Sequence, residues 1–143
     1  MGTAPKEVKI GSGPFEVDIM VEKIGHERAF VVPGRFHTGK DETKLPSISW
    51  KNCTTDFVRV WFPFGDRIFE NRVERRDKDG KEVKTPERNA ISFVANTFDI
   101  LPGGTLTLFV SDNAIDGTYH YHVYCEAIHE SAQGNSEPEV VVP

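Results

Sequence analysis

The chain has few of the residues that bind metals or form covalent crosslinks. Its 143 residues include two cysteines, two methionines and five histidines, and no histidine lies between His37 and His120. Two cysteines are too few for a disulfide-rich scaffold. Cys53 and Cys125 therefore leave three alternatives open: one disulfide bridge, two free thiols, or a thiolate that binds a metal.

A surplus of positive charge and a long apolar run are also missing. Lys and Arg number 17 against 22 Asp and Glu, so the net charge is −5, whereas a surface that binds nucleic acid needs the opposite balance. No apolar run is long enough to span a membrane, and the N-terminus lacks the apolar stretch of a secretory signal. We therefore expect a soluble chain without a nucleic-acid partner. It would be cytoplasmic as it stands, or periplasmic if a signal has been removed.

The dominant pattern is an alternation of apolar and polar residues, and helical periodicity is almost absent. Apolar residues occupy alternate positions in segments separated by Pro-Gly and Asp-Gly turns, namely 15–21, 48–50, 58–62, 106–110, 119–125 and 140–142. Short strands with such turns are typical of a sandwich or barrel. The sequence predicts a single all-β domain over residues 1–143, with about seven to eight strands.

Residues 66–89 depart from the alternation because they are dense in charged side chains. The Asp79-Gly80 pair favours a charged hairpin that projects into solvent. A short surface helix over 66–76 is the alternative.

Residues 117–142 read GTYHYHVYCEAIHESAQGNSEPEVVV, and this segment resembles the ligand-bearing end of cupredoxins, the blue copper proteins. Residues 48–52 and 58–62 resemble the strand pair that delivers that family's first histidine, and residues 101–105 resemble a turn of the same family. The resemblance implies a cupredoxin-like Greek-key β-sandwich. It also implies a thiolate at Cys125, an imidazole at His129 and an axial ligand at Gln133, since type 1 copper takes a thiolate, imidazoles and a weak axial donor.

The first histidine of the family pattern is missing here. Strand register places Asp56 at its position, just before Val58. A carboxylate is a hard ligand that copper beside a thiolate does not favour. We therefore expect the fold to be kept and the type 1 copper site to be lost, so that no cofactor is bound.

The candidate site residues each have a structural alternative. Cys125 fits a buried core thiol, or a disulfide to Cys53 at the same end of the sandwich. His120 and His122 fit a divalent-metal pair on one face of a strand, or a polar stripe facing solvent. Asn52-Cys53-Thr54 matches the N-glycosylation pattern, which we attribute to chance.

Three functions follow from these alternatives. The first is a non-catalytic binding or assembly module that has lost copper, with a protein partner or with self-association through edge strands such as 6–10 or 137–142. The second is a copper-binding electron carrier or copper carrier with Cys125, His129 and one of His120, His122 or Asp56. The third is an enzyme with a metal at the histidine pair. The first is preferred over the second because a copper carrier needs its ligands, whereas a fold can be kept without them and host other functions. No catalytic motif or triad spacing supports the third.

Overall fold

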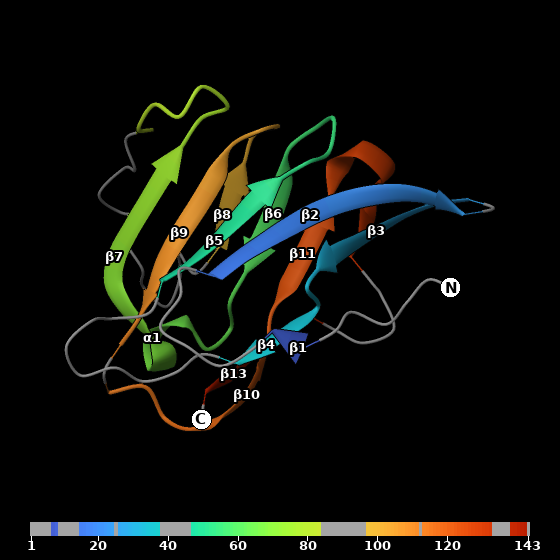
Figure 1. The fold of residues 1–143 in the computed structure, drawn as a ribbon. Helices are drawn as coiled ribbons and strands as arrows, with labels where there is room; N and C mark the ends of the chain where they lie inside the picture. Colours follow the sequence, from blue (N-terminus) through green and yellow to red (C-terminus); the bar gives the residue numbers. More distant parts are fainter. Residues whose placement is uncertain are drawn as a thin grey trace.

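Nearly all the regular structure in the computed structural model is β-strand (Figure 1). The structure describes residues 7–8, 15–24, 26–37, 47–83, 97–111, 113–132 and 138–142. Three sheets are named here by a central strand: the β5 sheet (order β3-β2-β5-β9-β7), the β6 sheet (β12-β11-β6-β8) and the β13 sheet (β1-β4-β13-β10). Their strands are β1 (Glu7–Val8), β2 (Phe15–Ile24), β3 (His26–Val32), β4 (Arg35–His37), β5 (Ser47–Asn52), β6 (Val58–Trp61), β7 (Phe69–Arg76), β8 (Thr97–Ile100), β9 (Thr105–Val110), β10 (Gly117–His120), β11 (His122–Cys125), β12 (Glu130–Ser131) and β13 (Glu139–Val142).

The core lies between the β5 and β6 sheets, which form two layers in Figure 1. Side chains alternate between buried and more exposed along β6, β8 and β9, as a strand with one face on a core requires. Phe62 lies at the centre of an aromatic cluster, with its ring centroid 5.0 Å from that of Trp50, 5.3 Å from Phe69 and 5.4 Å from Tyr121. The prediction of an all-β sandwich is confirmed.

The strands are more numerous than predicted. The described residues contain thirteen strand segments, against the seven or eight expected from the alternation. One cause is visible at Tyr121, which is buried and separates β10 in the β13 sheet from β11 in the β6 sheet. The alternation runs through this residue unbroken, so the sequence pattern alone shows one strand where the chain passes between two sheets.

The charged segment begins with a single-turn helix, α1 (Gly65–Ile68), and continues as β7. A turn at 77–80 then reverses the chain, because the Asp77 N–H donates to the Lys81 carbonyl and the Val83 N–H to the Arg75 carbonyl. The predicted hairpin is therefore present as far as residue 83, and residues 84–89 lie outside the described residues. The helix over 66–76 is wrong. No helix in the described part of the chain is long and apolar enough to cross a membrane.

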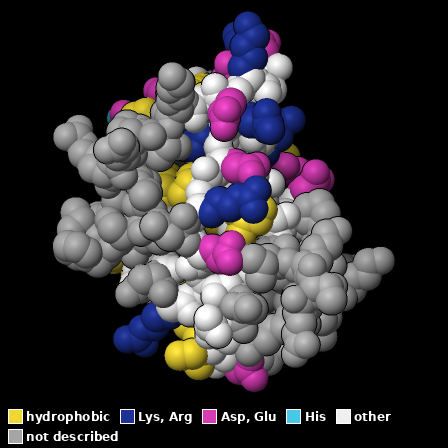
Figure 2. Space-filling model, turned by 90° about the vertical axis from the view of Figure 1, so that its left-hand side faces the viewer, with side chains coloured by type: hydrophobic (Ala, Val, Ile, Leu, Met, Phe, Trp, Pro, Cys, Tyr) yellow, Lys and Arg dark blue, Asp and Glu magenta, His cyan; other side chains and the backbone are white. Residues whose placement is uncertain are grey.

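The strand β7 is an integral edge strand rather than a projection into solvent. It pairs with β9, for example Val73 with Leu108. Lys, Arg, Asp and Glu side chains are intermixed along this side of the molecule (Figure 2), and Arg72 and Glu74 form an ion pair of 2.9 Å. Such charged side chains protect an exposed edge from pairing with another sheet.

The C-terminal strand was predicted as an open edge, and this prediction is wrong. Strand β13 pairs with β10 on one side and with β4 on the other. Its parallel partner β4 comes from far earlier in the chain, which no local pattern reveals. Strand β1, within the predicted 6–10 segment, does lie at the end of its sheet order.

Candidate functional site

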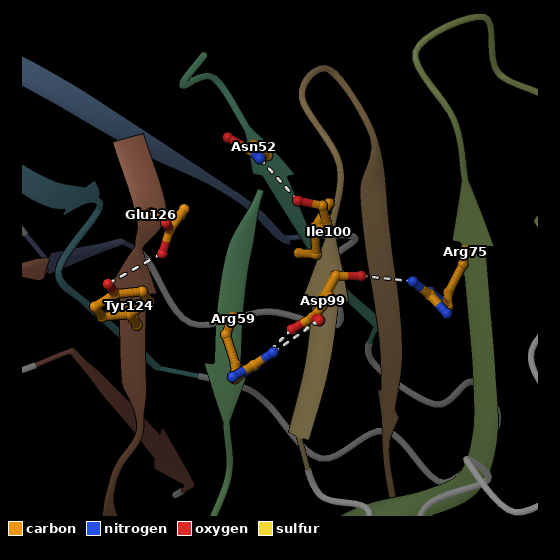
Figure 3. Close-up of polar contacts among 7 residues, drawn as sticks. All are labelled: Asn52, Arg59, Arg75, Asp99, Ile100, Tyr124 and Glu126. Carbon is orange, nitrogen blue, oxygen red and sulfur yellow. Dashed lines mark hydrogen bonds and ion pairs between the residues drawn. The ribbon is translucent and has the colours of Figure 1, made fainter. Parts of the chain in front are cut away.

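Asn52 forms hydrogen bonds to the loops at the end of the β6 sheet, where the resemblance to cupredoxins predicts the metal ligands. Its amide Nδ2 donates to the carbonyl oxygens of Asp56 and Ile100, both at 2.8 Å (Figure 3 shows the bond to Ile100). Its Oδ1 accepts from the Thr54 N–H at 2.8 Å and from the Thr54 hydroxyl at 2.7 Å. All four bonding positions are used inside the protein, and the Asn52 side chain is buried. This side chain is therefore inaccessible for glycosylation in the folded protein.

The turn at 101–104 joins the same network through its backbone. The Gly103 N–H donates to the Asn52 carbonyl, and the Asn52 N–H donates to the Gly104 carbonyl. Gly103 has a φ of +79°, and a Cβ there would lie 2.7 Å from the Cβ of Lys78. Glycine is thus required at this position by both conformation and space.

Cys125 is a core residue at the end of β11. It pairs across the strands with Val58, and its side chain is fully buried. Burial raises the pKa of the Cys125 thiol to about 11, so the thiol is protonated at neutral pH. A neutral buried thiol behaves as a small apolar group, whereas the metal-binding form is the thiolate.

The candidate disulfide between Cys53 and Cys125 is not formed. Both cysteines are free, since Cys53 is exposed on the loop after β5 while Cys125 points into the core. Partial desolvation and the nearby Asp18 carboxylate raise the pKa of Cys53, and Lys51 lowers it to a smaller extent.

We expect the two thiols to differ sharply in reactivity. In the native, unreduced protein one thiol per chain, Cys53, should react with a thiol reagent, and Cys125 should react only after unfolding. Absorbance titration in buffer and in denaturant checks this, with Cys53→Ser as the control that removes the native signal. A native protein with no reactive thiol, which gains two on reduction, would contradict the structure.

The Asp56 and His129 side chains each contact residues close to them in the sequence. The Asp56 Oδ1 accepts a 2.8 Å bond from the N–H of Phe57, so this carboxylate caps its own loop. His129 adopts the left-handed conformation with φ of 53°, and its side chain is 74% exposed. Its Nδ1 lies 3.5 Å from Glu126 Oε2 and 3.4 Å from the Tyr124 hydroxyl. Gln133 lies outside the described residues.

His120 and His122 have separate surroundings. His120 Nδ1 lies 3.5 Å from Glu139 Oε2, within the β13 sheet. His122 belongs to the β6 sheet, where its ring stacks on Trp61 with centroids 5.0 Å apart. Both side chains are exposed, as expected for a polar stripe. Among the described residues no three His, Cys, Asp or Glu side chains come together as a metal-binding group.

The outer face of the β6 sheet carries a second set of polar and aromatic side chains. Arg59 on β6 and Asp99 on β8 form a two-bond ion pair, with Nε to Oδ1 at 2.7 Å and Nη2 to Oδ2 at 3.1 Å (Figure 3). The hydrogen bond to Asp99 is the main cause that raises the pKa of Arg59. Tyr124 on β11 donates to Glu126 Oε1 at 3.1 Å.

Sequence reasoning gave no role to Asn52 or to Trp61. The available signal for Asn52 was register: after Ile48 and Trp50 it occupies the next inward position of β5, where a polar residue must find internal partners. The available signal for Trp61 was a large apolar residue at an outward position of β6, between the buried Val60 and Phe62.

No family model and no curated protein sequence matches the chain, whereas solved structures do. CueO, a bacterial laccase-like multicopper oxidase from the lignin-degrading Ochrobactrum sp., matches 99% of this chain at a TM-score of 0.56 and 11% identity. Fet3p, a multicopper oxidase that functions in iron import, matches 90% at a TM-score of 0.51 and 15% identity. The fold is cupredoxin-like. The reduced state of an amicyanin mutant matches 99% of this chain and 97% of its own at a TM-score of 0.46 and 17% identity.

The cupredoxin-like chain spans about a third of the two oxidases, 32% of one and 31% of the other. At these identities the likeness concerns the fold, and a cupredoxin-like fold can carry different functions on its surface.

Proposed function

We propose that the chain is a non-catalytic, cupredoxin-like binding module that has no type 1 copper site. The observation that carries the proposal is the state of the residues at the ligand positions. Cys125 is fully buried in the core, and the resemblance to cupredoxins puts Asp56 at the position of the family's first imidazole. The His129 imidazole is exposed beside Glu126 and Tyr124.

The donor chemistry supports the same conclusion. A type 1 site needs a deprotonated thiol and two imidazoles that converge on one point. Here a carboxylate, Asp56, takes the place of one imidazole, and the other candidate imidazole, His129, is exposed beside Glu126 and Tyr124. These residues do not fit a type 1 copper ion.

The loops at this end of the β6 sheet are instead held by hydrogen bonds. Asn52 bridges the 52–57 loop to β8, and the Glu126 N–H donates to the Phe57 carbonyl. These hydrogen bonds hold the loops at the end of the β6 sheet in place without a metal ion. A fold stabilised in this way is available as a scaffold for binding on its surface.

Copper titration of the reduced protein tests the proposal. We expect no intense visible band from thiolate-to-copper charge transfer, and no stoichiometric copper after gel filtration. Cys53→Ser is the matched control, because it removes adventitious binding at the exposed thiol. One equivalent of copper in an intensely coloured complex that survives Cys53→Ser and disappears in Cys125→Ser would overturn the proposal in favour of a copper carrier.

A further inference from the structure

The outer face of the β6 sheet presents six side chains in two rows, here called the Trp61 face. Strand register places His122, Trp61 and Thr97 side by side in one row, and Tyr124, Arg59 and Asp99 in the next. Between the two rows along the strands, Val60, Phe98 and Val123 point inward and are buried. The inner face is thus occupied by the core, while the outer face is available to a ligand.

Trp61 is the main apolar element of this face. It is 46% exposed, whereas Trp50, the other tryptophan, is fully buried in the core. The His122 ring stacks against Trp61 with an interplanar angle of 25°. Such packing restricts the indole to one orientation, and a ring held in place loses less entropy when a ligand packs on it.

The Arg59–Asp99 pair supplies polar groups one row away from the indole. Both side chains are about half exposed, at 51% and 46%, and their mutual bonds use Nε, Nη2, Oδ1 and Oδ2. A guanidinium has five N–H donors and a carboxylate about four acceptor sites, so donors and acceptors remain free side by side. A hydroxyl group both donates and accepts, which matches such a pair.

Other kinds of ligand fit this face less well. A nucleic acid would place phosphates beside Asp99 and Glu126 on a chain of net charge −5. A proline-rich peptide offers mainly carbonyl acceptors, which supply no donor to the acceptor sites of Asp99 that Arg59 does not use. A face of three strands and two rows covers at most a few hundred Å², whereas a stable dimer buries about 800 Å² per partner.

We propose that the Trp61 face binds a neutral saccharide, with the C–H side of a sugar ring packed on the indole and neighbouring hydroxyls bonded to Arg59 and Asp99. Aromatic ring faces carry partial negative charge and attract the polarised C–H groups of a sugar. The inference rests on the binding role proposed above and gives that role a ligand class.

The test uses the full chain and a panel of neutral oligosaccharides built from glucose, mannose, xylose or N-acetylglucosamine. Trp61 is the exposed indole, so we expect at least one member to change the tryptophan emission saturably and to bind in calorimetry. Trp61→Ala should weaken binding about tenfold or more, and Asp99→Asn should also weaken it. Ile115→Ala is the matched control, because Ile115 is an exposed apolar residue outside this face and its loss should leave affinity unchanged.

Three results would overturn the inference: no member of the panel binds at millimolar concentration, binding survives in a folded Trp61→Ala variant, or Trp61→Ala instead abolishes a dimer or oligonucleotide binding. Circular dichroism and a thermal melt of each variant confirm that it is folded. Copper titration is independent of this panel. Failure of saccharide binding therefore leaves the copper-free module intact, and copper binding would leave the saccharide result standing.

Discussion

Replacement of Asn52 by alanine is expected to lower the free energy of unfolding by about 3–5 kcal/mol. The substitution removes both donors to the Asp56 and Ile100 carbonyls and the acceptor for the Thr54 N–H and hydroxyl. These groups are buried or partly buried, and each one left without a partner costs about 1–3 kcal/mol. Chemical denaturation monitored by tryptophan fluorescence measures the change.

Two further variants make the Asn52 result specific. Thr54→Val removes the hydroxyl but keeps both Nδ2 bonds, so it should cost only about 1 kcal/mol. Asn113→Ala changes an exposed asparagine and should have almost no effect. If Asn52→Ala were as mild as Asn113→Ala, the loops would not depend on this network.

Replacement of Phe62 by alanine should destabilise the protein by a similar amount, about 3–5 kcal/mol. Phe62 is almost completely buried and its ring meets those of Trp50, Phe69 and Tyr121. Its removal leaves a cavity that these rings, each fixed by other neighbours, cannot fill. Denaturation curves of the variant and the wild type give the difference.

Phe62→Leu is the conservative comparison, since it keeps most of the volume and should cost distinctly less than the alanine variant. Phe57→Ala is the matched control, because Phe57 is only partly buried and lies outside the aromatic cluster. A loss at Phe62→Ala no greater than that at Phe57→Ala would show that the cluster does not hold the two sheets together.

Alternation predicted the core because burial on one face of a strand is a local property. Ile48 and Trp50, Val58 and Val60, and the inward residues of 106–110 are buried as expected. The cupredoxin resemblance, carried by the segments 48–62, 101–105 and 117–142, is confirmed for the fold. Alternation failed at 137–142, where the parallel partner β4 is distant in sequence, and at 66–76, where dense charge belongs to an edge strand.

The sequence predicted where the candidate site residues lie along the strands. It did not predict the protonation of the thiol or the contacts of the histidines. Register placed Asp56 and Cys125 at the same end of the sheet, and the Glu126 N–H indeed bonds to the Phe57 carbonyl there. The protonation of Cys125 depends on the core packed around it, and the partners of His120 and His122 depend on the break at Tyr121. Both are tertiary properties that spacing does not encode.

Amide NMR spectra of the reduced Cys53→Ser protein, recorded with and without one equivalent of Cu(I), test the central claim most directly. The variant removes the exposed thiol and keeps every other residue at the ligand positions. We predict that the resonances of Asp56, Cys125 and His129 remain where they are in the metal-free spectrum. A concerted shift of all three, saturating at one equivalent, would show that a copper centre assembles there and would contradict the account.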